Sequence, residues 1–195
     1  YGELDSITEI EIDNNPISYY TDVTYETRMG TNTQEALTNI PATYADQQLN
    51  YELTIPIEGD EKWRTQRVEG NAAEALEVTF VFPNGLYYVT ESGGNTAISV
   101  TVQAQYRKVG ETAWTDWLTG ETITSSVNSS FYRSYTKAGL SSGTQYEVRT
   151  RCTYKQGGEG SSRYSNRVYW GQLTGIVYDK LQRPGKALLA IKALA

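Results

Sequence analysis

The chain has no histidine and a single cysteine among its 195 residues. Without histidine, neither a Ser-His-Asp nor a Cys-His relay can form, and the commonest general base and zinc ligand are both missing. One cysteine cannot form an internal disulfide, which favours a protein that folds in a reducing compartment over a secreted, disulfide-rich module. We therefore expect no catalytic residue, no metal site and no cofactor, and we interpret the chain as a non-enzyme.

Long apolar runs and basic charge are also scarce. No run approaches the roughly 18 apolar residues that span a membrane. Lys and Arg number 17 against 23 Asp and Glu, for a net charge of −6. This balance argues against nucleic acid as the main partner. With only three Phe but 16 Tyr and four Trp, the composition favours a β protein that has half-buried aromatic side chains.

Residues 146–155 show the clearest pattern in the chain. Tyr146, Val148 and Cys152 alternate with charged or polar residues, which indicates a half-buried strand of an antiparallel sheet. Residues 98–107 alternate in the same way, and about seven such strands are separated by turn signals, as in a β-sandwich. The predicted core consists of Leu76, Phe80, Val100, Val102, Tyr146, Val148, Val168 and Trp170.

The segment before this strand resembles a known corner. Leu140 precedes a polar turn containing Gly143, and Tyr146 then begins the strand. The order is similar to the corner before strand F of fibronectin type III domains, where the Leu plugs the core and the Tyr hydroxyl bonds back across the turn. We predict an all-β fold, with a fibronectin type III-like (immunoglobulin-like) antiparallel β-sandwich over residues 49–174.

The two flanks do not fit this sandwich. Residues 1–48 contain strand-like runs at 7–12 and 23–28, and we interpret residues 30–48 as a loop that links them to the sandwich. Residues 71–75 are a candidate single helical turn. The return segment, residues 175–195, ends in an apolar run that we expect to be a strand of another domain. The sandwich would then be an insertion between two flanking β segments of one parent domain.

The flanks carry a resemblance to a phage family. The motif Gly30-Thr31-Asn32-Thr33-Gln34 with Ile40-Pro41 precedes the sandwich, and Arg183-Pro184-Gly185-Lys186-Ala187-Leu188 follows it. In this order they resemble the middle of the tail tip attachment, or host specificity, proteins of long-tailed siphophages (lambda J type), although Lys186 replaces the usual Thr. The resemblance implies a structural protein of the virion tail tip, made in the bacterial host cytoplasm, in which the parent domain of the inserted sandwich is a tail hub domain. Its implied partners are copies of itself, other tail tip proteins and the host cell surface.

Three features are candidate sites. Trp114 and Trp117 would lie on opposite faces of a strand, so one is a candidate exposed contact, although packing at a sheet edge is the simpler interpretation. Glu58, Asp60 and Glu61 offer oxygen ligands, but their spacing matches no calcium loop, and we interpret them as a solvated turn. The alternative function is a fibronectin III-like adhesion or carbohydrate-binding module of a bacterial surface protein that binds through exposed aromatics.

Overall fold

The computed structural model describes residues 2–38, 42–178 and 182–193, and it divides the chain into two compact units. Residues 44–177 form one unit, which we call the sandwich unit. Residues 1–43 and 178–195, which precede and follow it in the chain, form the other, which we call the flanking unit. Each unit is described by itself below.

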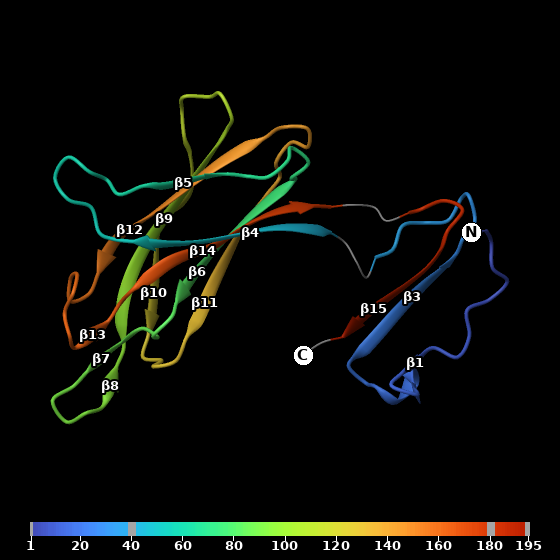
Figure 1. Ribbon diagram of the computed structural model, residues 1–195, viewed down its shortest axis with the longest axis horizontal. Coiled ribbons are helices and arrows are strands. Elements are labelled where there is room, and N and C mark those ends of the chain that lie inside the picture. The colour runs from blue at the N-terminus through green and yellow to red at the C-terminus, as the bar shows by residue number, and fades with distance from the viewer. Residues whose placement is uncertain (1, 39–41, 179–181, 194–195) are drawn as a thin grey trace. The chain divides into compact units, whose positions relative to one another are not determined.

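Two four-stranded sheets build the sandwich unit (Figure 1). The first sheet has the order β10 (Thr115–Ser125), β9 (Ile98–Lys108), β12 (Tyr146–Lys155) and β5 (Arg64–Arg67). The second has the order β11 (Phe131–Ala138), β6 (Ala75–Phe82), β14 (Val168–Val177) and β4 (Thr43–Leu53). A small third sheet joins β13 (Tyr164–Ser165), β7 (Tyr87–Val89) and β8 (Asn95–Thr96). The predicted all-β antiparallel sandwich is confirmed, with eight main strands.

The core lies between the two large sheets. The strands alternate buried and outward residues, most regularly in β9 and β12. All eight predicted core residues are at most 2 % exposed and belong to one cluster. Aromatic rings fill its second-sheet side, where Phe82 stacks on Phe131 at 4.7 Å between centroids. Each buried large side chain contributes roughly 1.5–3 kcal/mol before chain entropy is subtracted.

The last strand lies in an unusual place. In an immunoglobulin-type sandwich, the final strand pairs with the strand before it in the C–F–G sheet. Here β14 crosses to the other sheet and pairs with β6, while β5 takes the edge position beside β12. As a result β14 is the direct neighbour of β4, the first strand of the sandwich.

Cross-strand contacts fix the direction of this pair. Thr174 Oγ1 donates to Asp46 Oδ1 at 2.7 Å, and Gln48 Nε2 donates to Gln172 Oε1 at 2.6 Å. Because residue numbers rise along one strand as they fall along the other, β4 and β14 run antiparallel. The start of β4 at Thr43 therefore lies beside the end of β14 at Val177, so the chain enters and leaves the sandwich at adjacent points, as Figure 1 also shows.

A two-stranded ribbon forms the centre of the flanking unit. Strand β3 (Val23–Met29) pairs antiparallel with β15 (Ala187–Ala193), so segments from opposite ends of the sequence lie side by side. A short hairpin, β1 (Glu11–Ile12) and β2 (Asn15–Pro16), precedes the 3-10 turn η1 (Ile17–Tyr19). Asp13 and Asn14 both have positive φ, as the type I′ two-residue hairpin turn requires.

Several local predictions were wrong. Strand β4 starts at Thr43, within the predicted linker. The sequence pattern missed its first half because that half has few apolar residues, and its buried position is Gln47, whose amide bonds the backbone at Arg67 and Glu69. Residues 71–75 form a bend and the start of β6, since so short a helical segment has too few hydrogen bonds to persist. In the predicted strand at 7–12, only Glu11–Ile12 pairs. Ile40-Pro41 lies outside the described residues.

Candidate functional site

The predicted corner is built around the hydroxyl of Tyr146. The ring is buried, and its oxygen accepts a hydrogen bond from the backbone N–H of Ser141 at 3.0 Å and donates to the Ser141 carbonyl at 3.4 Å. Leu140 packs against the core, and its N–H donates to Glu74 O at 2.9 Å. Gly143 has φ +83°, in the left-handed region that favours glycine. The hydroxyl thus closes the turn that leads into β12.

Val148 and Trp170 are fully buried on facing sheets. The Trp170 ring meets Tyr51 edge-on, with centroids 6.0 Å apart. Its Nε1 donates to the carbonyl of Gln172 at 2.9 Å across the bulge in β14. The indole is therefore satisfied both by apolar packing and by its one polar bond, as buried Trp requires. These residues serve the fold and leave no reactive group.

A stack of alternating arginines and tryptophans covers the outer face of the first sheet. Arg107 Cζ lies 4.3 Å from the ring centroid of Trp114, and Arg149 Cζ lies 4.4 Å from the same ring. Arg149 is also 4.3 Å from the ring of Trp63, and Arg151 is 4.4 Å from that ring. The order is Arg107, Trp114, Arg149, Trp63, Arg151. Each cation–π contact contributes about 0.5–2 kcal/mol, more where it is desolvated.

Acidic and amide side chains orient the guanidinium groups of this stack. Glu147 accepts hydrogen bonds from Arg107 at 2.8 and 2.9 Å and from Arg67 at 3.0 Å, and these bonds lower the pKa of its carboxyl. Gln105 Oε1 accepts from Arg149 Nε at 2.7 Å. Burial lowers the pKa of the Arg149 guanidinium. Because the arginines are satisfied within the protein, we assign the stack a stabilising role.

This arrangement changes the interpretation of the two candidate tryptophans. Trp114 is half-buried in the stack, and Trp117 is half-buried against the core, so neither is a freely exposed contact. The edge-packing alternative describes Trp117. Sequence reasoning missed Trp63 and the stack. A signal was present, because Arg107, Arg149 and Arg151 fall on the outward positions of two alternating strands, but their pairing with Trp63 and Trp114 depends on the fold.

In the acidic turn at residues 58–61, Asp60 and Glu61 form ion pairs with basic side chains. Asp60 lies 2.6 Å from Lys62 Nζ, and this pairing lowers the pKa of Asp60. Glu61 accepts from Trp63 Nε1 at 2.9 Å and pairs with Arg151 at 3.3 Å, which together lower its pKa. Within the described ranges, no three His, Cys, Asp or Glu side chains form a group that could hold a metal ion.

Cys152 is fully buried on the inner face of β12. Burial raises the pKa of its thiol to about 11, so the reactive thiolate is strongly disfavoured at neutral pH. The prediction that it is a small buried side chain is confirmed. In the part of the chain that the structure describes, no helix is long and apolar enough to cross a bilayer.

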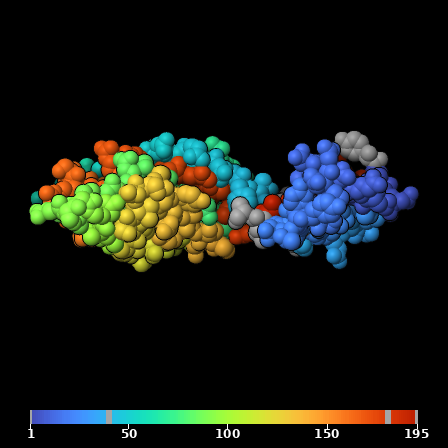
Figure 2. Space-filling model, turned by 90° about the horizontal axis from the view of Figure 1, so that it is seen from below, coloured from blue at the N-terminus to red at the C-terminus, as the bar shows by residue number. Residues whose placement is uncertain are grey.

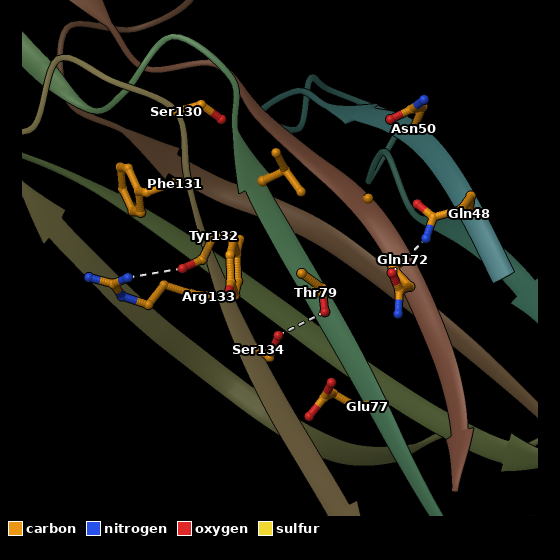
Figure 3. A pocket seen from close by; sticks show the side chains of 12 residues that line it. Gln48, Asn50, Glu77, Thr79, Ser130, Phe131, Tyr132, Arg133, Ser134 and Gln172 are labelled. Atoms are coloured by element: carbon orange, nitrogen blue, oxygen red, sulfur yellow. Dashed lines mark hydrogen bonds between the residues drawn. The ribbon is translucent and has the colours of Figure 1, made fainter. Parts of the chain in front are cut away.

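A trough crosses the outer face of the second sheet and has a volume of about 900 Å³ (Figure 3). Its floor comes from the central strands β6 and β14, where Thr79, Val81 and Gly171 are short. The edge strands supply longer side chains: Tyr132 on β11 and Gln48 on β4 stand on opposite sides in Figure 3. The complete lining is Gln48, Asn50, Glu77, Thr79, Val81, Ser130, Phe131, Tyr132, Arg133, Ser134, Gly171 and Gln172.

Two antiparallel sheets around an apolar core, with a Tyr hydroxyl closing the corner, define a fibronectin type III-like domain. A comparison with protein families finds the FNIII-A domain of tip attachment protein J over residues 43–179. The chain belongs to this family. It is therefore part of a phage tail protein, and the predicted resemblance to lambda J-type proteins is confirmed.

Solved structures give only distant similarity. A carbohydrate-binding module specific for non-crystalline cellulose, CBM28, is 8 % identical with a TM-score of 0.33, covering 80 % of this chain and 87 % of that one. A structure of infectious bursal disease virus, Gt strain, is 11 % identical with a TM-score of 0.27, covering 100 % of this chain and 42 % of that one. Neither score is high enough to support an argument. The comparison with curated proteins finds no matching relative.

Proposed function

We propose that the chain is a structural segment of the phage tail tip, in which the sandwich is inserted into a hub domain whose two halves are residues 1–43 and 178–195. The observation that carries this proposal is the pairing of β3 with β15, which joins the chain before the sandwich to the chain after it. The adjacent entry and exit strands β4 and β14 support the same interpretation. An insertion needs both features, because its ends must return to one parent sheet.

The motif residue Gln34 supports the proposal further. Its buried amide Nε2 donates to the carbonyls of Gln182, Arg183 and Lys186 at 2.6, 2.9 and 3.0 Å, while its Oε1 accepts from Gly30 N–H at 2.8 Å. The Gln of the Gly-Thr-x-x-Gln motif thus hydrogen-bonds directly to the return segment. A Cβ on Gly30 would lie 2.4 Å from Gly2 O and 3.0 Å from Ala187 N, so only glycine fits there.

In this role the protein catalyses no reaction. Copies of the full-length protein assemble with one another and with other tail tip proteins through the hub, and the sandwich braces or decorates the tip. Contact with the host surface is a second role, and the trough on the second sheet favours it.

Two experiments test this proposal. Immunogold labelling of virions with an antibody raised against residues 44–177 should mark the tail tip; label on the capsid or along the tail tube would refute the assignment. In the full-length protein, replacing residues 44–177 by a short Gly-Ser linker should preserve the oligomer measured by analytical ultracentrifugation. Loss of the oligomer on this replacement would show that the sandwich, and not the hub, carries assembly.

A further inference from the structure

The trough is a shallow hollow in the sheet surface. Its walls stand on the two edge strands, and its floor on the two central strands is kept low by small side chains. Gly171 contributes to this, because a Cβ there would lie 2.5 Å from Val81 Cγ2. Thr79 and Ser134 join their hydroxyls at 2.8 Å across the floor. The volume of about 900 Å³ is in the range of ligand sites.

An exposed aromatic ring forms one wall. Tyr132 is 68 % exposed, on the edge strand β11 beside Val81 of β6. Among the described residues, its ring stacks on no other ring and its hydroxyl has no hydrogen-bond partner. An aromatic face exposed at the side of a polar trough can cover the apolar C–H face of a sugar ring.

Neutral amides form the opposite wall. Gln48 and Gln172 are joined by one hydrogen bond, and Gln172 also donates to Thr174, which fixes both amides in orientation. Gln48 Oε1 remains open as an acceptor. Asn50 has positive φ, and among the described contacts its side-chain amide makes no hydrogen bond. Orientated amides that can both donate and accept match the hydroxyl groups of a sugar, each of which does the same.

The trough also continues beyond the sheet face. Ser130 lines it and also lines a second hollow of about 780 Å³ among the loops that flank β7 and β13. Leu86 N–H donates to Val127 O at 2.8 Å, which holds the segment before β11 against the segment before β7. Figure 2 shows green and yellow parts of the sandwich unit side by side on one face. Two hollows sharing one residue suit an elongated chain of several units.

The charge and composition of the residues that line the trough favour a glycan over other polymers as its ligand. The trough contains one arginine, Arg133, and one acid, Glu77, so it has no basic track for a phosphate backbone. A protein interface usually has apolar or aromatic side chains at its centre, whereas most of the residues that line this trough are polar, including Thr79, Ser134 and Gln172. The trough therefore fits a largely uncharged, hydroxyl-rich chain.

We propose that the trough between Tyr132 and the Gln48–Gln172 pair binds a polysaccharide of the bacterial cell surface. The sugar ring stacks on Tyr132, and its hydroxyls bond to Gln48, Asn50 and Gln172. This inference names the ligand of the proposed host-surface contact and rests on that second role, whereas the proposed assembly role does not depend on it.

The test uses the full 195-residue chain and an array of purified bacterial O-polysaccharides, core oligosaccharides and capsular polysaccharides, followed by calorimetry on those that bind. Saturable binding to at least one of them is expected. Tyr132→Ala should weaken it about tenfold, the effect of one lost stacking contact. Ser134→Tyr, which fills the trough, should abolish it.

Matched controls lie on the other sheet. Tyr154→Ala removes a tyrosine that is 50 % exposed on β12, and Thr122→Tyr alters the Thr101–Thr122 hydroxyl pair that corresponds to Thr79–Ser134. Both should bind the polysaccharide like the unmodified chain. Three outcomes would overturn the inference: no binding anywhere on the array, binding that survives both trough variants, or binding to a host surface protein without any glycan. None of them affects the hub assembly test.

Discussion

The sandwich unit and the flanking unit are each stabilised internally by a different kind of interaction. In the sandwich unit, apolar side chains from eight strands form one buried cluster, and polar contacts lie mainly on the outside of the sheets. In the described part of the flanking unit, the buried apolar residues are only Ile17, Leu37, Ala42 and Ala190. Its segments are joined instead by side chains that bond to the backbone.

Arg28 illustrates the second means. Its guanidinium donates to the carbonyls of Glu35 and Ala36 at 2.7 and 2.6 Å and pairs with Glu26. Together with Gln34 it anchors a loop and a return segment that have almost no core of their own. A two-stranded ribbon is marginal by itself. The sandwich can therefore fold on its own core, whereas the flanking unit depends on a few specific polar bonds.

The largest expected effect is the loss of the sandwich core. Trp170→Ala should lower the free energy of unfolding of the sandwich by about 3–5 kcal/mol, because it removes the largest fully buried side chain and leaves a cavity. Urea unfolding followed by near-ultraviolet circular dichroism measures it. Tyr169→Ala, the half-buried neighbour on the opposite face of β14, is the control and should cost far less. Equal losses for the two variants would contradict a single dry core.

A smaller and more local effect is expected at Gln34 and its four hydrogen bonds, which we call the polar clasp. Gln34→Ala removes four hydrogen bonds, three to part-buried carbonyls and one that satisfies the buried N–H of Gly30, which should cost the flanking unit about 2–3 kcal/mol. Amide hydrogen exchange should show loss of protection in β3 and β15 and no change in β9 and β12.

Gln47 offers the matched control for this variant. It is a similarly buried glutamine whose amide bonds the backbone at Arg67 and Glu69, but it lies in the sandwich unit. Gln47→Ala should leave exchange in β3 and β15 unchanged. If Gln34→Ala also left these strands protected, the flanking unit would have to be held by contacts other than the clasp.

The difference between an apolar core and long-range polar bonds also explains which features could be predicted from the sequence. Period-two alternation found β6, β9, β12 and the core, because burial on one face of a strand leaves a pattern in neighbouring residues. The corner at Tyr146 was also readable, since its residues are close in the chain. The role of Gln34 could not be predicted from the sequence, because the carbonyls that it bonds lie about 150 positions away in the chain.

The exchange of β5 and β14 and the Arg–Trp stack were missed for a related reason. Alternation predicts that a strand has a buried face but does not say which sheet it joins. The stack unites Trp63, Trp114 and Arg149, which are remote in sequence and meet only when β5 lies at the edge beside β12. The trough likewise depends on β4 and β14 being neighbours. Such features follow from topology rather than from local pattern.

The smallest expected effect concerns charge on the outside of the sandwich. Glu147 bridges Arg107 and Arg67, and their hydrogen bonds lower the pKa of its carboxyl below the usual value of 4.5. A lowered folded-state pKa means that the stabilisation is fully present above pH 4.5 and is lost as the pH falls through the folded-state pKa. At pH 7, Glu147→Gln should reduce the free energy of unfolding by about 1 kcal/mol. Below pH 4 the difference between variant and unmodified chain should shrink toward zero, as measured by urea unfolding at each pH.

Glu52→Gln is the control, because Glu52 makes only a surface pair with Arg167. A Glu147 difference that stayed constant from pH 7 to pH 3 would mean that packing, and not charge, makes this side chain stabilising.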